Sequence, residues 1–297
     1  HWWGPAHHAP TVVEMDVRPG GRWRFELHAH ENVFGFGGEY QAVERPSLLR
    51  QTFVFDPFPD HGSVEEAKLD TNVCAYVATG VWHHWLCTWD RGFVDHLWPT
   101  VRRALDWVLS MRRPNGTVLW ACEEHDRPWD YALLTGSSSI RHSLRCGAML
   151  AALVDDHADK YLRAADAIDS VVRTNLGAFE PKERWAMDWY YPVMTGTMDG
   201  AQAQDRLASM WNTFAMEGFG IRCVSDEPWV TAAETAECSL AHSALGDLDT
   251  AVKLLSWTRA HRCDDGSYLT GIVYPDRVSF PADERTAYTG AAIILAA

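Results

Sequence analysis

The sequence lacks the features that mark membrane proteins and nucleic-acid-binding proteins. Its uninterrupted apolar stretches, such as residues 148–154, are far shorter than the ~20 residues of a membrane-spanning helix. No run of Lys and Arg is longer than two residues, and the 297-residue chain carries a net charge of −14. Because an acidic surface repels a phosphodiester backbone, we expect no nucleic-acid partner. Because the apolar stretches are short, we expect no membrane span either.

Cysteine pairs and a leader peptide are missing as well. The seven cysteines are scattered, and none stands in a Cys-x-x-Cys pair. This pattern is typical of reduced thiols in a cytoplasmic protein and predicts no metal site. The N-terminus has no basic segment followed by an apolar one and no initiator Met, so we expect that the true start of the chain is missing.

Tryptophan, by contrast, is abundant, with 15 residues. An excess of Trp indicates deep aromatic cores or platforms for ligands. The chain opens with HWWGPAHHAP, in which His1, His7 and His8 are clustered. No carboxylate or cysteine lies beside them to complete a metal site, so a binding role is disfavoured there.

The hydrophobic pattern divides the chain into two parts. Residues 11–56 alternate apolar and polar side chains between Gly and Pro turns, which predicts an antiparallel meander of about four strands. From Asp70 onward the apolar residues recur at helical spacing, and helix pairs repeat roughly every 50 residues. We therefore predict an α+β chain, with a β segment at 1–66 and a mainly α, incomplete (α/α)6 toroid at 67–297.

The loops between the helix pairs share a pattern. Residues 112–120 (RRPNGTVLW) and 262–271 (RCDDGSYLTG) both show a helix end, an Asn/Asp-Gly-Ser/Thr turn and an extended aromatic piece, and 177–192 occupies a similar place. Long loops at one end of each helix pair are expected to form the functional rim.

The first part resembles a known family. WWGP (2–5), RPGGRWRF (18–25) and GGEYQAVERPSLLRQTF (37–53) are similar to the SRPBCC superfamily, in the branch named after the activator of the heat-shock chaperone ATPase. That resemblance implies a helix-grip fold around an apolar cavity. The strand and helices that precede HWWGP in the family are absent here, and so is the long C-terminal helix. We expect a truncated helix-grip segment, with HWWGPAHHAP as its stub.

The second part resembles an actinobacterial prenyltransferase-like family, whose fold is similar to that of six-hairpin glycosidases and terpene cyclases. The resemblance rests on residues 70–86, 133–146, 184–196, 221–237 and 264–276. It implies an (α/α)6 barrel of twelve helices. About eight are predicted here, so we expect that one or two hairpins are lost and that the chain joins two partial domains.

A glycosidase needs two carboxylates beside the scissile bond. Asp188 lies among aromatic residues, where burial would raise its pKa toward that of a general acid. Glu234, near the start of a helix, is predicted as its partner, and Asp226 is an alternative candidate for the catalytic pair. Each has a structural alternative, because acids also cap helices and turns.

Aromatic residues of the rim are the candidates for stacking on sugar rings. With Asp70, whose loop should face the same rim, the predicted substrate-binding set is Asp70, Trp120, Trp129, Trp185, Trp189, Tyr190, Trp229 and Tyr268. No cofactor is predicted.

The sequence leaves three functions open. We favour a carbohydrate-active enzyme acting at a glycosidic bond of an oligosaccharide or glycoconjugate. Isoprenoid transfer or cyclisation is the second hypothesis, although no DxDD motif is present and only Arg141, Arg145 and Arg222 are available for a diphosphate. The third is a non-catalytic, ligand-binding remnant. Because an open barrel exposes apolar helix faces, a homo-oligomer is also a hypothesis.

Overall fold

The computed structural model describes all residues except 1–10, 30–31, 45–47, 52–53, 56–68 and 124–126. The chain forms two compact units, His1–Ala67 and Lys68–Ala297. The HWWGPAHHAP segment lies outside the described residues, so the stub hypothesis stays a prediction.

The first unit contains an antiparallel sheet, as its alternating pattern predicts. Its strands are β1 (Thr11–Met15), β2 (Arg22–Ala29), β3 (Asn32–Glu44), β4 (Leu48–Gln51) and β5 (Val54–Phe55), in the order β1–β2–β3–β4, with β5 on β3. The turn between β1 and β2 requires glycine, because a Cβ on Gly21 would lie 2.0 Å from the carbonyl oxygen of Asp16. Trp23 and Tyr40 are buried.

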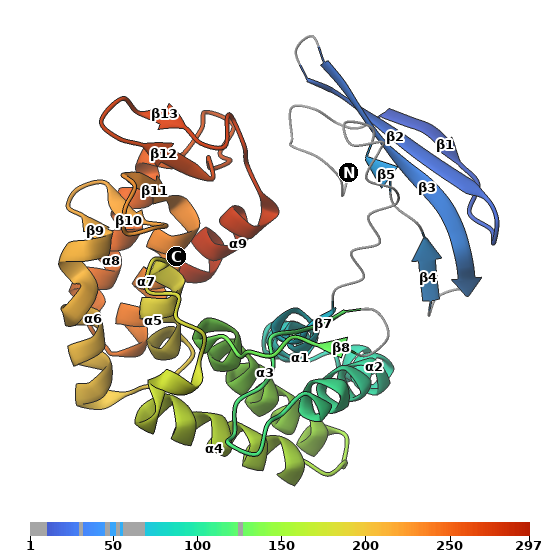
Figure 1. The fold of residues 1–297 in the computed structure, drawn as a ribbon, viewed down its shortest axis with the longest axis horizontal. Coiled ribbons are helices and arrows are strands. Elements are labelled where there is room, and N and C mark those ends of the chain that lie inside the picture. Colours follow the sequence, from blue (N-terminus) through green and yellow to red (C-terminus); the bar gives the residue numbers. More distant parts are fainter. Residues whose placement is uncertain (1–10, 30–31, 45–47, 52–53, 56–68, 124–126) are drawn as a thin grey trace. The chain divides into compact units, whose positions relative to one another are not determined.

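The second unit is mainly helical (Figure 1), which confirms the predicted change of period near Asp70. Its helices are α1 (Thr71–Thr88), α2 (Arg91–Ser110), α3 (Leu134–Leu153), α4 (Asp159–Thr174), α5 (Ala186–Met194), α6 (Gly200–Phe214), α7 (Ala232–Ala244), α8 (Leu248–Trp257) and α9 (Ala287–Ala296), with short 3-10 turns at Leu176–Ala178 and Thr258–His261.

The helices form an arc of pairs. The odd-numbered helices α1, α3, α5, α7 and α9 pack on one another in sequence, and each of the first four also packs against the helix that follows it. Helices α3 and α7 are buried along most of their length, whereas α2 and α4 bury only one face. The arrangement is the incomplete α/α toroid that the sequence predicts. Among the described helices, none is both long and apolar enough to cross a bilayer.

Short strands precede α1, α3, α7 and α9. They are β6 (Leu69–Asp70), β7 (Ala121–Glu123) and β8 (Arg127–Pro128) in one sheet, and β9 (Ala215–Met216), β10 (Gly220–Arg222), β11 (Trp229–Thr231), β12 (Gly271–Val273) and β13 (Val278–Ser279) in another. The strands and their loops lie at the N-terminal ends of these helices.

Candidate active site

Backbone hydrogen bonds join the loops before the odd-numbered helices into one rim. Each bond links the start of one helix to the loop that leads into the next. The bonds are Thr71 N to Trp120 O, Glu180 N to Ala132 O, Ala186 N to Cys223 O and Ala232 N to Thr270 O, at 2.9, 2.9, 3.0 and 3.1 Å. The helix N-termini therefore face a common edge, where the predicted acids were placed.

Asp188 is the third residue of α5 and is buried. Its Oδ1 accepts a hydrogen bond of 3.2 Å from the hydroxyl of Thr135, at the start of α3. Arg206 of α6 donates to the main-chain oxygen of Asp188 rather than to its carboxylate. Burial raises the pKa of Asp188, against the lowering effects of Thr135 and Arg206. The side chain thus has the environment of a proton donor.

Glu234 has the same position on the neighbouring helix, because it is the third residue of α7 and α5 packs against α7. It is buried, yet both of its carboxylate oxygens have donors. Thr231 donates to Oε2, and the thiol of Cys223 donates to Oε1 at 3.3 Å. Hydrogen bonds donated to a carboxylate favour its charged form. The arrangement suits a base or nucleophile better than an acid.

Asp226 has a different environment. Its carboxylate is exposed and lies 2.9 Å from Nε of Arg184. The hydrogen bond from Arg184 lowers the pKa of Asp226. An exposed acid held ionised by arginine does not suit proton donation, so the structure favours Asp188 and Glu234 over this residue.

Asp70 lies beside an aromatic cluster. It is the N-cap residue of α1, although its side chain makes no capping hydrogen bond. Strand β6 pairs it with Ala121, directly after Trp120. The rings of Trp120, Trp129 and Tyr131 lie within 5.7 Å of one another, measured between centroids. The structure thus brings together Asp70, Trp120 and Trp129, as predicted, and adds Tyr131.

Tyr131 connects this cluster to Asp188. Both residues line a cleft of about 550 Å³, together with Arg113, Glu180 and Arg206. The cleft follows the rim from the loop before α3 to the first turn of α5. It is large enough for a sugar residue and offers both charged groups and an aromatic face.

Trp185 and Trp229 form a second aromatic cleft, of about 320 Å³, with Phe280. Trp185 is the N-cap residue of α5, and the guanidinium of Arg184 lies over its ring at 5.4 Å. Trp229 meets Phe280 edge to face, at 5.3 Å. Because both tryptophans lie on the rim, the prediction that they contact substrate fits their location.

Three predicted binding residues lie in packing positions instead. Trp189 is 3% exposed and stacks on Phe214, and Tyr190 is fully buried. Tyr268 packs against the small core that α7 and α9 share. Trp189 and Tyr190 cannot offer a ring face to a ligand, because both side chains turn into the core when the segment MDWYYP forms a helix. For these two residues the predicted stacking role is wrong.

Glu237 was not among the predicted residues. It lies three positions after Glu234 and therefore on the same face of α7. The hydroxyls of Tyr190, Tyr191 and Tyr288 donate to its carboxylate at 2.5, 3.2 and 2.5 Å. Burial raises the pKa of Glu237 to about 7, against the hydrogen bonds from the tyrosines. The Glu-x-x-Glu spacing was the signal that could have revealed it.

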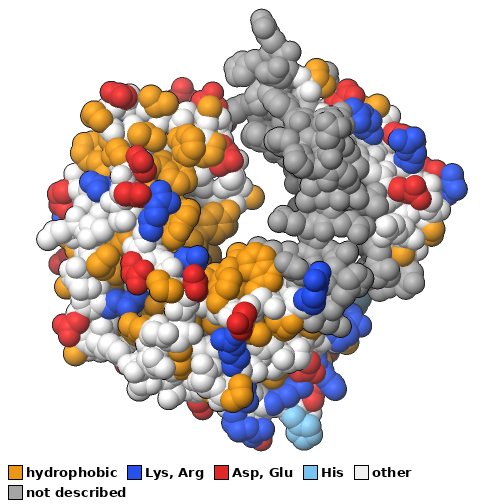
Figure 2. Space-filling model, viewed as in Figure 1, with side chains coloured by type: hydrophobic (Ala, Val, Ile, Leu, Met, Phe, Trp, Pro, Cys, Tyr) orange, Lys and Arg blue, Asp and Glu red, His pale blue; other side chains and the backbone are white. Residues whose placement is uncertain are grey.

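The carboxylate of Glu237 lines a cavity of about 350 Å³ inside the arc. Tyr76, Tyr288 and Leu295 contribute to its walls, and all three are substantially exposed. Hydrophobic side chains gather on this concave side of the helices (Figure 2). A buried acid thus lies at the wall of a mainly apolar space, one helical turn below Glu234.

Two of the three arginines considered for a diphosphate, Arg141 and Arg145, are neutralised. Arg141 pairs with Asp169 through two nitrogens, at 2.7 and 3.0 Å. Arg145 donates to both Asp166 and Asp169. Side chains that already share carboxylates do not form an anion site, which disfavours the isoprenoid hypothesis.

Comparison with known proteins agrees with both predicted resemblances. Residues 1–75 match the family model described as Activator of Hsp90 ATPase homolog 1-like protein. Over 237 residues, 80% of the chain, the sequence is 46% identical to the MMP endo-(1,4)-3-O-methyl-alpha-D-mannosidase of Mycolicibacterium hassiacum. The chain spans 66% of the length of that relative.

Solved structures give the fold of the second unit. A GH63 mannosylglycerate hydrolase from Thermus thermophilus matches with a TM-score of 0.57 at 13% identity, covering 75% of this chain and 74% of that one. A D-mannose isomerase matches with a TM-score of 0.53, also at 13% identity, covering 80% and 72%. The second unit has a glycosidase-like fold. The glycosidase resemblance is confirmed, and the comparisons lend the isoprenoid alternative no support.

Proposed function

We propose that the second unit carries a carbohydrate-active site that cleaves an α-linked mannose chain by carboxylate acid/base catalysis. Asp188 protonates the leaving oxygen, and Glu234 activates water or attacks the anomeric carbon. The observation that carries this proposal is the matching position of the two acids, each third in one of two packed helices of a glycosidase-like fold.

The different environments of the two acids support different roles. Asp188 is buried with a single hydroxyl donor on its carboxylate, and its pKa is raised. Glu234 receives a hydroxyl and a thiol donor. Two carboxyl groups held in such different surroundings are the pattern expected of an acid and a base.

The substrate class follows from the relative. The name of that enzyme describes cleavage within a chain of 1,4-linked, 3-O-methylated α-mannose. The aromatic cluster beside Asp70 and the cleft lined by Trp185 and Trp229 provide faces for the apolar sides of such sugars. We propose an endo-acting hydrolase or transferase on this oligosaccharide, with the protein itself free in solution in the cytoplasm.

The test is turnover of α-1,4-linked 3-O-methylmannose oligosaccharides, followed by mass spectrometry of the products. D188N and E234Q are expected to lose at least a hundredfold in kcat while still binding the oligosaccharide. D95N is the matched control, because Asp95 is an exposed acid of α2 paired with Arg91. Unchanged turnover in both amide variants would overturn the assignment, and binding without turnover by the parent chain would indicate a non-catalytic protein.

A further inference from the structure

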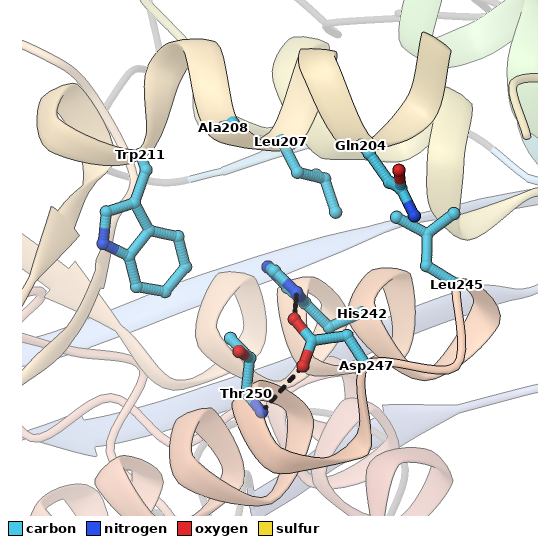
Figure 3. A pocket seen from close by; sticks show the side chains of 8 residues that line it. All are labelled: Gln204, Leu207, Ala208, Trp211, His242, Leu245, Asp247 and Thr250. Atoms are coloured by element: carbon cyan, nitrogen blue, oxygen red, sulfur yellow. Dashed lines mark hydrogen bonds and ion pairs between the residues drawn. The ribbon is translucent and has the colours of Figure 1, made fainter. Parts of the chain in front are cut away.

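A pocket of about 430 Å³ lies away from the rim, between α6 and the turn that joins α7 to α8 (Figure 3). Its principal side chains come from α6 and from the C-terminal end of α7. Because Glu234 begins α7 and His242 ends it, the two sites are separated by about 12 Å along the helix axis. The pocket is lined by Gln204, Leu207, Ala208, Trp211, His242, Leu245, Asp247 and Thr250.

A fixed imidazole forms one wall of this pocket. Nδ1 of His242 lies 2.9 Å from Oδ2 of Asp247, and the other carboxylate oxygen accepts from the backbone N–H of Thr250 (Figure 3). With Nδ1–H donated to Asp247, Nε2 is the remaining hydrogen-bonding atom of the ring. The His242 side chain is 10% exposed, and Nε2 has no hydrogen-bond partner among the described residues.

The unpartnered Nε2 of His242 is a candidate for a hydrogen bond with a ligand. A buried polar atom without a partner costs free energy, and native structures contain few of them. A hydroxyl that donates to Nε2 would remove that cost. The hydrogen bond between Nδ1 and Asp247 holds the ring so that Nε2 is available to the pocket. In functional histidines, too, a hydrogen bond at one ring nitrogen orients the other.

The adjoining wall is aromatic and apolar. Trp211 meets the ring of His242 edge to face, with centroids 5.7 Å apart. In Figure 3 its indole and the side chain of Leu207 extend from α6 toward His242, and Gln204 stands at the edge of the pocket. An apolar surface with a few directed polar groups is the composition of a small-molecule site.

We propose that this pocket is a second, non-catalytic binding site for a sugar residue. Trp211 covers the C–H face of the ring, and one sugar hydroxyl donates to Nε2 of His242. A sugar fits because it presents an apolar face and hydroxyls at its edge. Only the choice of a mannose-type sugar rests on the proposed function, and no catalytic residue takes part.

The experiment uses the whole chain labelled with 5-fluorotryptophan and titrated with 3-O-methyl-D-mannose. The fluorine signal of Trp211 is assigned by its loss in W211F. We expect this signal to shift in a saturable way. A208W should abolish the shift by filling the pocket from an exposed position, and N212W, which adds the same side chain outside the pocket lining, should retain it.

His242 is tested separately. H242F should weaken binding about tenfold, equivalent to about 1.4 kcal/mol. If that variant fails to fold, A208W decides. An absent shift, a shift that survives A208W, or an equal shift with glycerol would each overturn the proposal. Loss of oligosaccharide turnover leaves this result untouched, since the two sites are measured independently.

Discussion

The side chains of Asn115 and Asp265 make the same pair of hydrogen bonds in two turns far apart in the sequence. Oδ1 of Asn115 accepts from the N–H and the hydroxyl of Thr117, at 3.1 and 2.8 Å. Oδ1 of Asp265 accepts from the N–H and the hydroxyl of Ser267, at 3.0 and 2.6 Å. Each turn follows a helix end and leads into a rim strand. The two repeats therefore share the same side-chain hydrogen bonds as well as the same order of elements.

Removing this side chain should weaken the turn and the rim beyond it. We expect N115A to lower the free energy of unfolding by about 1 kcal/mol, because two hydrogen bonds lose their acceptor. D265A should cost more, since Asp265 also binds Arg285 at 2.9 Å. Urea denaturation measures both. N115D keeps the acceptor oxygen and serves as the control; equal losses in N115A and N115D would contradict the explanation.

The donors of Glu234 can be tested one at a time. T231V removes the hydroxyl bound to Oε2 without a large change in volume, which should reduce kcat roughly tenfold, or about 1.4 kcal/mol. Steady-state kinetics on the oligosaccharide measures this loss.

T231S, which keeps the hydroxyl, should restore the rate. C223A should have a smaller effect than T231V, because a thiol is a weak donor. An unchanged kcat in T231V would mean that the hydroxyl of Thr231 does not support the role of Glu234.

The aromatic cluster beside Asp70 should contribute binding rather than chemistry. We expect W129A to raise KM about tenfold with kcat nearly unchanged, since stacking acts equally on substrate and transition state. W89A is the matched control, because Trp89 is exposed at the C-terminal end of α1. Steady-state kinetics on the oligosaccharide distinguishes the two, and a loss confined to kcat would place Trp129 in a different role.

The period of the sequence predicted most of the fold. Alternating apolar residues over 11–56 predicted the antiparallel sheet, and apolar residues at helical spacing from Asp70 predicted the paired helices. Both patterns arise because a strand or a helix buries one of its faces. The two similar turns at 112–120 and 262–271 were recognisable from the sequence because a turn requires particular residue types at particular positions. The segment 177–192 does not repeat them and instead contains a 3-10 turn before α5.

The site was harder to predict, since it depends on which way a side chain points. Trp189 and Tyr190 follow Asp188 directly, yet they turn into the core while Asp188 reaches Thr135. Sequence composition marked all of them as loop residues. Glu237 was overlooked because its tyrosine partners come from two other helices, and only the fold brings them together.

Glu237 should make stability depend on pH. Its pKa is about 7 in the folded chain and near 4.5 when unperturbed. Between these values the folded chain keeps a proton that the unfolded chain has lost. The free energy of unfolding therefore falls as pH rises from about 4.5 to about 7, and this contribution is constant above that window.

The E237Q variant should remove this contribution, so the difference in Tm between variant and parent should grow from pH 4.5 to 7 and then level off. Y288F provides a second test. It deletes one donor to the carboxylate, which raises the pKa of Glu237 and extends the decline to higher pH. Thermal melts across this range measure both, with the exposed acid variant E180Q as control. Parallel Tm curves for E237Q and the parent would show that Glu237 carries no proton in the folded chain at neutral pH. The three tyrosine hydroxyls would then have to stabilise its charged carboxylate.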